Sequence, residues 1–390
     1  MNAYLIDGYR TAVGKAPKGL FRFMRPDDLA ASVISHLLKQ VPALDPACID
    51  DLIVGNAVPE AEQGMQMGRI ISLLCLPIQV PGFIINRYCG SGLEAIAIAA
   101  ARIHAGQADC IIAGGTESMS MVPTTGWKMA LNYRLAKEHA NYYLSMGLTA
   151  EMVQKKYAIS RESQDAFAFR SHQRALKAME EGRFTSQIVP VEVEEVFVDD
   201  NNKKQVRRYT VDRDEGPRAD TSPEALAKLK PVFAEGGTVT AGNSSQTSDG
   251  ASFVLLMSER KMKELGLQPK GRMMSYAAAG VDPAIMGIGP IEAVPKALKL
   301  AGISASQLEL IELNEAFASQ SLAVMQELAL DPEMVNVNGG AIALGHPLGC
   351  SGAKLTVQLF NELQRQNKRY GMVTACVGGG QGVAGIFERF

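Results

Sequence analysis

Hydrophobic and polar residues alternate along the chain with two periods, one typical of strands and one typical of amphipathic helices. Short apolar runs rich in β-branched residues predict strands over 2–11, 50–58, 80–89 and 109–118. Apolar residues at helical spacing predict helices over 27–41, 64–76 and about 91–106. Strands that alternate with helices are typical of a layered α/β domain in which helices cover a sheet.

The same alternation returns in the last third of the chain. Strands are predicted over 272–281, 308–313, 334–338 and 371–377. Helices are predicted over 290–302, 315–330 and 351–371. The late segment GMVTACVGGGQG resembles the earlier DCIIAGGTES, because each is a strand followed by glycine and small residues. This similarity suggests an internal duplication.

Residues 119–245 interrupt the pattern with scattered methionines and long polar loops. A long helix is predicted over 160–184, and the charge run Lys203–Arg208 predicts a solvated hairpin. We therefore interpret residues 119–245 as an insertion or a lid-like region.

Composition narrows the class of protein. The 390 residues are 47% hydrophobic and 21% charged, as in ordinary globular proteins. The net charge of −2 argues against a protein that binds nucleic acid without sequence preference. Six cysteines without a CxxC pair favour neither a zinc site nor a disulfide scaffold. With no evident signal peptide and no apolar run long enough to span a bilayer, we expect a cytoplasmic location.

Cys89 is the strongest candidate for chemistry. Ser91 and Glu94 match a capping box, which places Cys89 just before the start of the predicted helix. Free backbone N–H groups and the positive end of the helix dipole favour a thiolate there. Gly90 and Gly92 allow a sharp turn that keeps the sulfur accessible. A cysteine so placed is a candidate nucleophile, although most cysteines are buried and take no part in chemistry.

Three more residues with useful chemistry lie at predicted strand ends or in glycine-flanked loops. His346 lies in such a loop, and Ser351 is placed to cap the helix that follows. Cys376 ends a strand before three glycines, and Asn314 follows another strand. Each has an ordinary alternative when taken singly: a loop-stabilising histidine, a small buried hydrophobe, or a helix cap.

Six motifs together resemble the thiolase family. They occur in the family's order along essentially the whole chain: NRYCGSGLEAIA, TAGNSSQTSDGA, MGIGP, LNEAFA, NGGAIALGHPLGCSGA and CVGGGQG. The chain most resembles the degradative branch of bacterial β-oxidation, whose members cleave 3-ketoacyl-CoA. The resemblance implies two similar mixed α/β halves in αβαβα layers, with an inserted loop domain that binds coenzyme A. The boundaries expected from it are 1–118 with 246–265 for the first half, 119–245 for the insertion, and 266–390 for the second half.

The resemblance also implies a role for each candidate. Cys89 would attack the 3-keto carbon, release acetyl-CoA and keep an acyl group that a second CoA thiol removes. His346 would take the proton from Cys89 and later from CoA, and Cys376 would protonate the departing enolate. One oxyanion hole would use His346 with a water held by Asn314, and the other the N–H groups of Cys89 and Gly378. Coenzyme A is then a substrate, and no permanent cofactor or metal is required.

Five residues match positions along the family's coenzyme A site. Ser245 matches a serine that contacts the pantetheine, and Arg218 matches an arginine near the CoA nucleotide. Met146 and Phe317 match apolar walls of the pantetheine tunnel, and Met286 matches a residue near the acyl end. Packing in the core is the alternative for each apolar one.

Two residues differ from those of the biosynthetic branch and favour the degradative branch. Acetoacetyl-CoA thiolases of the biosynthetic branch carry histidine where this chain has Ser145, and serine where it has Ala225. The alternatives are such an acetoacetyl-CoA thiolase, a decarboxylating ketoacyl synthase and a non-catalytic thiolase-like lipid-binding subunit. A synthase generally has histidine in place of Cys376, and a non-catalytic subunit would lack one of Cys89, His346 or Cys376.

Partners follow from the resemblance as well. The family forms homodimers and often homotetramers, and some degradative members work with a hydratase–dehydrogenase subunit. We therefore expect acyl-CoA and coenzyme A as ligands and a homo-oligomeric assembly. We expect no nucleic acid and no membrane span.

Overall fold

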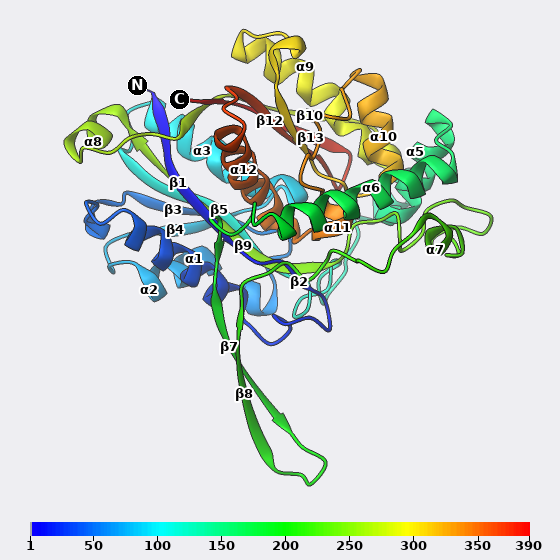
Figure 1. Ribbon diagram of the computed structural model, residues 1–390, viewed down its shortest axis with the longest axis horizontal. Coiled ribbons are helices and arrows are strands. Elements are labelled where there is room, and N and C mark those ends of the chain that lie inside the picture. Colours follow the sequence, from blue (N-terminus) through cyan, green and yellow to red (C-terminus); the bar gives the residue numbers. More distant parts are fainter. Residues whose placement is uncertain (1) are drawn as a thin grey trace.

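Figure 1 shows the computed structural model of the protein, which describes residues 2–390, with the two chain ends close together. The strands are β1 (Ala3–Thr11), β2 (Gly14–Lys15), β3 (Asp51–Gly55), β4 (Gly82–Ile85), β5 (Cys110–Ser118), β6 (Ile188–Val189), β7 (Val191–Val198), β8 (Lys204–Val211), β9 (Ser248–Ser258), β10 (Gly271–Gly280), β11 (Leu310–Leu313), β12 (Tyr370–Val377) and β13 (Gln381–Arg389). The helices are α1 (Pro26–Gln40), α2 (Met67–Cys75), α3 (Ser91–His104), α4 (Tyr133–Glu138), α5 (Met146–Tyr157), α6 (Arg161–Glu180), α7 (Pro223–Ala227), α8 (Glu259–Glu264), α9 (Gly289–Ala301), α10 (Ala318–Glu327), α11 (Ala341–Leu344) and α12 (Leu348–Arg365).

The strand order shows the internal duplication that the sequence suggested. The strands pair in the order β11-β12-β13-β10-β1-β9-β5-β3-β4. Outward from the β1–β10 junction, the first half runs β1, β9, β5, β3, β4 and the second half runs β10, β13, β12, β11. In both halves the two inner strands are antiparallel, and the strands after them run parallel to one another. A duplicated frame with one shared mixed sheet is therefore confirmed.

The predicted strand over 334–338 is wrong. Only an isolated bridge joins Val335 to Ile311, at the place where the second half would have its counterpart of β4. The chain turns at Asn336, whose φ is +47°. The Asn336 side chain accepts from Leu313 N at 2.9 Å and donates to Leu313 O at 2.8 Å. A side-chain amide thus takes the backbone groups that a paired strand would otherwise satisfy.

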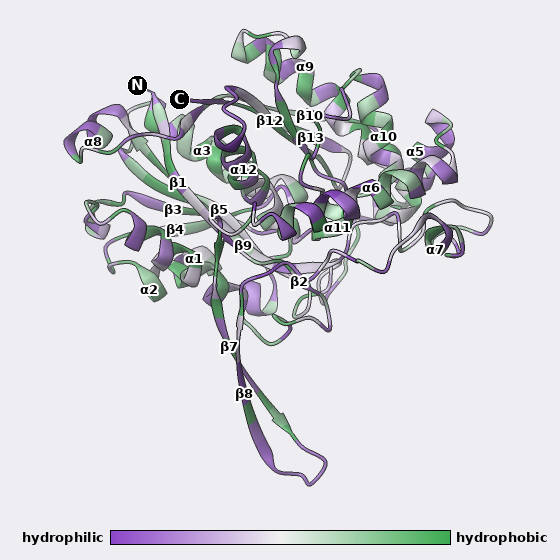
Figure 2. Ribbon diagram, viewed as in Figure 1, coloured by the Kyte–Doolittle hydropathy of each residue, from purple (hydrophilic) through white to green (hydrophobic). Residues whose placement is uncertain are grey.

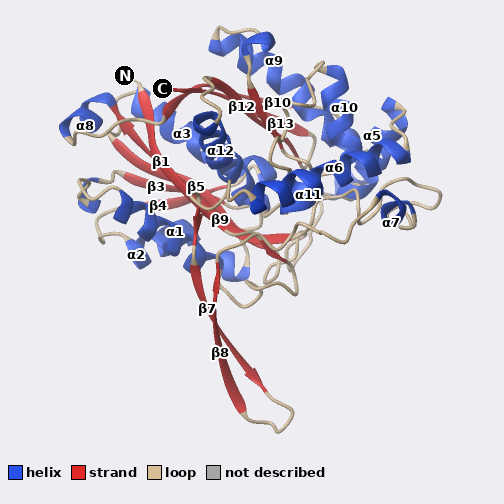
Figure 3. Cartoon of the chain, viewed as in Figure 1, coloured by secondary structure: helices blue, strands red, loops and turns tan. Residues whose placement is uncertain are grey.

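Five layers result from the packing of helices on both faces of each half. One apolar core joins α1 and α2 to β3, β5 and β9. A second core, which contains α3 and α12, fills the space between the two halves of the sheet. A third core packs α9 and α10 on the far face of β10–β13. Figures 1 and 3 show this αβαβα order, which confirms the expected fold class.

Helix α3 begins at Ser91, as expected, but the predicted capping box does not form. The helix is preceded by Gly90, and the Ser91 hydroxyl accepts from Arg87 N and donates to Tyr88 O. Glu94 pairs instead with the Arg87 guanidinium and accepts from the hydroxyl of Tyr276, which comes from β10. These tertiary partners outcompete the local bond because they are charged or come from a packed neighbour.

The middle of the chain holds the long loops and the hairpin that the sequence predicted. Strands β7 and β8 pair from Val191–Val211 to Val198–Lys204 and project away from the layers (Figure 1). Figure 2 shows many hydrophilic residues on this hairpin, and most of its outer residues are exposed. The solvated hairpin over 203–208 is confirmed, and the domain boundaries remain a prediction. Across residues 2–390, no helix is long and apolar enough to cross a membrane.

Candidate active site

Cys89 lies in a short 3-10 turn, η3 (Tyr88–Gly90), between β4 and α3. This turn packs against both α12 and β12, and a Cβ on Gly90 would lie 3.1 Å from the side chain of Val377, the last residue of β12. Tyr88 has a φ of +42°, which is uncommon for a bulky residue. Its N–H donates to Asn86 Oδ1 at 2.8 Å, and its carbonyl accepts from the Ser91 hydroxyl at 2.6 Å. These bonds hold the turn that directs Cys89 toward the centre of the molecule.

Glycine is required where α3 meets the first turn of α12. A Cβ on Gly92 would lie 2.8 Å from the carbonyl oxygen of Gly349, closer than real side chains approach. Gly349 is equally confined, since its Cβ would lie 2.6 Å from the Cα of Asn56. The two backbones can therefore approach closely enough to bring Cys89 and the histidine loop into one site.

Cys89 is partly buried, and its sulfur lies against backbone N–H groups of Gly378 and of Cys89 itself. Burial raises the pKa of the Cys89 thiol to about 11, although the two N–H groups lower it in part. Desolvation therefore outweighs the helix start and the N–H groups, which favour a thiolate. The resting group is a neutral thiol with two donors already beside it.

His346 is buried directly before α12. Its Nε2 lies 3.3 Å from Asn314 Nδ2, and its Nδ1 lies 2.5 Å from Ser351 Oγ. Burial, with the nearby Lys354 cation, lowers the pKa of His346 to about 3, so the imidazole is neutral near pH 7. A neutral imidazole is able to accept a proton.

Ser351 does not cap α12 as expected. The helix starts at Leu348, because Pro347 occupies the position before it with a φ that suits a helix start. Ser351 consequently lies one turn inside, where its hydroxyl contacts the Pro347 carbonyl and His346. Asn314 is not a helix cap either, because α10 begins only at Ala318.

Cys376 is fully buried in an apolar cluster that includes Met286, Phe317 and, at its edge, Met146. Burial raises the pKa of the Cys376 thiol, and the neighbouring Cys89 raises it further. The structure thus gathers three of the predicted coenzyme A and acyl contacts around the second cysteine. A Cβ on Gly378 would lie 3.7 Å from both the Met146 sulfur and the Tyr88 ring, so this glycine lines the same region.

The two polar coenzyme A candidates differ in position. Ser245 donates its backbone N–H to the Ala316 carbonyl at 2.9 Å, which sets it beside Phe317. Arg218 is exposed, pairs with Asp220 at 3.1 Å, and donates its backbone N–H to His172 Nδ1. Its described contacts do not join it to the cluster around Cys376. Ser245 is therefore brought to the candidate site and Arg218 stays on the surface.

Glu117 is a buried residue of the site that the sequence analysis missed. Its carboxylate accepts from the N–H groups of Ala57 and Gly349 at 2.8 Å each, and from Gln63 Nε2 at 2.8 Å. It therefore ties the loop after β3 to the first turn of α12, and residues of both pack in the cluster that Cys89 contacts. A usable signal was present, because an acidic residue at the end of an otherwise apolar, buried strand needs partners.

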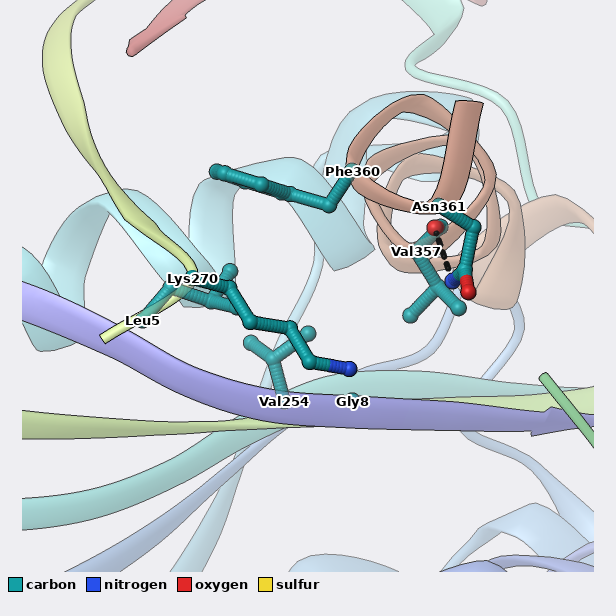
Figure 4. A pocket seen from close by; sticks show the side chains of 7 residues that line it. All are labelled: Leu5, Gly8, Val254, Lys270, Val357, Phe360 and Asn361. Carbon is teal, nitrogen blue, oxygen red and sulfur yellow. Dashed lines mark hydrogen bonds between the residues drawn. The ribbon is translucent and has the colours of Figure 1, made fainter. Parts of the chain in front are cut away.

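A separate small pocket between β1 and α12 contains none of the predicted site residues (Figure 4). Its lining residues are Leu5, Gly8, Val254, Lys270, Val357, Phe360 and Asn361. Lys270 pairs with Asp7, and Asn361 donates to the Val357 carbonyl. In the described part of the chain, no group of three or more His, Cys, Asp or Glu residues is arranged to hold a metal ion.

Comparison with family models and known proteins identifies the family of the chain. The model described as thiolase, N-terminal domain, matches residues 3–260, and the model described as thiolase, C-terminal domain, matches residues 267–389. The chain is 53% identical over 387 residues to a 3-ketoacyl-CoA thiolase of Bacillus subtilis (strain 168), which covers 99% of each chain. It is 46% identical to an acetyl-CoA acetyltransferase of Pseudomonas aeruginosa, with 97% of each chain covered.

Comparison with solved structures leads to the same family. The crystal structure of the Bacillus anthracis acetyl-CoA acetyltransferase superposes with a TM-score of 0.88 at 40% identity. The match covers 100% of this chain and 99% of that one. The chain therefore belongs to the thiolase family and is an acyltransferase.

Proposed function

We propose that this acyltransferase cleaves 3-ketoacyl-CoA with coenzyme A, giving acetyl-CoA and an acyl-CoA shortened by two carbons. The observation that carries the proposal is the position of η3. This turn brings Cys89 to the place where the start of α12 and the end of β12 meet. A nucleophile, a neutral base and a second thiol then share one buried site beside an apolar cluster.

In the first half-reaction, the Cys89 sulfur attacks the 3-keto carbon while its proton passes to His346. Both groups are neutral at rest, because the pKa of the thiol is raised to about 11 and that of the imidazole is lowered to about 3, so the proton moves only as the new bond forms. The C2–C3 bond then breaks, the keto carbon remains on sulfur as a thioester, and the bonding electrons leave as the acetyl-CoA enolate. Cys376 gives its proton to the enolate carbon and recovers one from the His346 imidazolium.

In the second half-reaction, the incoming CoA thiol gives its proton to His346 and attacks the thioester. The Cys89 sulfur leaves and takes the proton back, which restores the free protein. The N–H groups of Gly378 and Cys89, which already lie against the sulfur, are placed to stabilise an adjacent oxyanion. His346 and Asn314 would stabilise the other oxyanion, with a water between Asn314 and the substrate.

The apolar cluster supports the substrate assignment. Met146, Met286 and Phe317 surround Cys376 with side chains suited to a pantetheine arm or an acyl chain. Phe233 extends this wall, since its ring lies edge-on to that of Phe317 with centroids 6.2 Å apart. Ser245 lies beside this wall and supplies a polar group for the pantetheine amide. Arg218 lies apart and would reach only the nucleotide end.

The test is CoA-dependent thiolysis of a series from acetoacetyl-CoA to 3-ketohexadecanoyl-CoA, with Cys89→Ala as the control. Cleavage of longer members that the variant does not perform supports the proposal. Activity confined to acetoacetyl-CoA would support condensation of two acetyl-CoA molecules instead. Two of the related proteins are named acetyl-CoA acetyltransferase. Absence of cleavage by folded protein would refute the proposal in favour of a non-catalytic lipid-binding subunit.

Assembly and cellular role are part of the same proposal. We expect a homodimer or homotetramer of this chain, working in the fatty acid β-oxidation of the cytoplasm, with a hydratase–dehydrogenase subunit as a candidate partner. Light scattering of the purified chain tests the oligomer, and co-expression with such a subunit followed by co-purification tests the partner. A monomer by light scattering would contradict the first expectation.

A further inference from the structure

The hydrogen bonds around the His346 ring assign its protons. Ser351 Oγ lies 2.9 Å from the Pro347 carbonyl oxygen and 2.5 Å from His346 Nδ1. The carbonyl has no proton to offer, and it also accepts the N–H groups of Cys350 and Ser351 at 3.0 Å each. The single hydroxyl proton of Ser351 therefore points to this carbonyl, because two oxygens at that distance without a proton would repel.

The contact with Nδ1 then needs a proton from the ring. With its own proton committed, the Ser351 oxygen presents a lone pair to His346, so Nδ1 carries hydrogen and donates. In a neutral imidazole the other nitrogen must then be bare. This is consistent with the far side of the ring, where Asn314 Nδ2, a donor, faces Nε2 at 3.3 Å.

We propose that Ser351 is a positioning residue, which holds His346 in the tautomer with hydrogen on Nδ1 and a free lone pair on Nε2. Ser351 contacts one ring nitrogen of His346 and Asn314 contacts the other, and both contacts favour this tautomer. The group is also well protected, since His346 is 4% exposed and Ser351 is 2% exposed. Water therefore cannot readily substitute for the hydroxyl.

The consequence for catalysis rests on the function proposed above. A bare Nε2 is the atom able to receive the proton of Cys89 or of coenzyme A. The Asn314 bond to it is long, so a closer proton donor can displace it. Once Nε2 is protonated, the same atom becomes a donor toward an oxyanion, while Nδ1 keeps its bond to Ser351. Ser351 thus acts through His346 in both half-reactions without touching the substrate.

The chain supplies a matched control in the same helix. Thr356 Oγ1 donates to the Gly352 carbonyl at 2.8 Å, the same bond four residues back that Ser351 makes to Pro347. Thr356 is fully buried, and its hydroxyl bond is to the helix backbone rather than to His346. Thr356→Val therefore removes an equivalent helix hydroxyl without affecting the proton on the ring.

The direct test is nitrogen NMR of 15N-histidine-labelled protein near pH 7.5, with the His346 signals identified by their loss in His346→Asn. The wild type is expected to show a protonated Nδ1 and a bare Nε2, and Ser351→Ala a mixture of tautomers. Ser351→Thr, which keeps the hydroxyl, should restore the wild-type pattern. A wild type with hydrogen on Nε2 overturns the proposal, even if Ser351→Ala fails to fold.

Kinetics provide the second readout. Ser351→Ala should lower kcat about tenfold to a hundredfold with little change in KM, whereas Thr356→Val and Ser351→Thr stay near wild type. Equal kcat in Ser351→Ala and wild type overturns the positioning role. If the wild type shows the expected tautomer but cleaves no 3-ketoacyl-CoA, the proposed function fails and the tautomer assignment stands.

Discussion

The two halves of the molecule place different chemistry at equivalent positions. Helices α3 and α12 occupy matching places in the duplicated frame and pack against each other in the central layer. Cys89 stands two residues before Ser91, where α3 starts, and His346 stands two residues before Leu348, where α12 starts. The duplication therefore brings two helix starts to one site, and one half supplies the proposed nucleophile while the other supplies the proposed base.

The matching strands differ in the same way. Glu117 is the last residue but one of β5, and Cys376 is the last but one of β12. Both face a glycine on the antiparallel neighbour, Gly250 for Glu117 and Gly382 for Cys376. Glu117 binds backbone N–H groups of the loop after β3 and of the first turn of α12, whereas Cys376 lies in the apolar cluster. Equivalent positions thus hold a structural carboxylate in one half and a candidate proton donor in the other.

The comparison of helix starts predicts the largest effect. Cys89→Ala should lower thiolysis by about a thousandfold or more, because no other group can carry the acyl thioester. The matched control is Cys75→Ala, since Cys75 is a partly buried cysteine on α2 that bonds only within its helix. Steady-state thiolysis measures both. Comparable losses in the two variants would mean that Cys89 acts through stability.

The comparison of strand ends predicts opposite effects for its two members. Glu117→Ala leaves the N–H groups of Ala57 and Gly349 without an acceptor. The free energy of unfolding should therefore fall by about 2–4 kcal/mol. Cys376→Ala removes one small apolar group and should lower stability by about 1 kcal/mol, while it lowers the rate far more. Urea unfolding and thiolysis on both variants separate these outcomes. The reverse pattern would contradict the assignment of roles.

The next prediction concerns the inserted region, where helix α6 contains the buried His172. Burial lowers the pKa of His172 to about 4, so the unfolded chain binds a proton that the folded chain does not between about pH 6.5 and 4. The free energy of unfolding should therefore decrease as the pH is lowered from about 6.5 to 4, by up to roughly 3 kcal/mol from this group.

The variant His172→Gln keeps an acceptor for Arg218 N but does not titrate. Its unfolding free energy should depend less steeply on pH than that of the wild type between pH 6.5 and 4, as measured by urea unfolding at several pH values. An unchanged pH dependence would show that other groups cause the acid sensitivity.

The smallest effect is expected on the projecting hairpin. Arg208 pairs with Glu194, and both side chains are at least half exposed. Arg208→Ala should change the unfolding free energy by no more than about 0.5 kcal/mol, because solvent screens such pairs. Thermal unfolding monitored by circular dichroism is sufficient to check this. A larger loss would show that the hairpin is packed against another chain in solution.

The sequence predicted helices and strands where the hydrophobic period was clear. It did not predict helix caps or hydrogen-bond partners that depend on residues distant along the chain. Glu94 matched a capping box, yet its carboxylate binds Tyr276, which lies 182 residues away. Ser351 matched a cap, yet Pro347 starts the helix one turn earlier. Local pattern contains no information about such competitors.

The sequence also could not predict the charge states of buried groups or the partners of buried polar side chains. A helix start favours a thiolate, but only the packed structure shows how far burial raises the pKa of Cys89. The buried Arg10–Asp214 pair, 2.7 Å apart, joins residues 204 positions apart. In contrast, the clustering of Met146, Met286 and Phe317 around Cys376 agrees with positions that the family resemblance had marked.

The most direct test of the account is mass spectrometry of the protein quenched after mixing with 3-ketohexadecanoyl-CoA in the absence of free coenzyme A. A tetradecanoyl adduct is expected on the peptide that contains Cys89. The adduct should be absent in Cys89→Ala and removed by added coenzyme A. Acetyl-CoA release without any adduct, or an adduct on Cys376 in place of Cys89, would contradict the account.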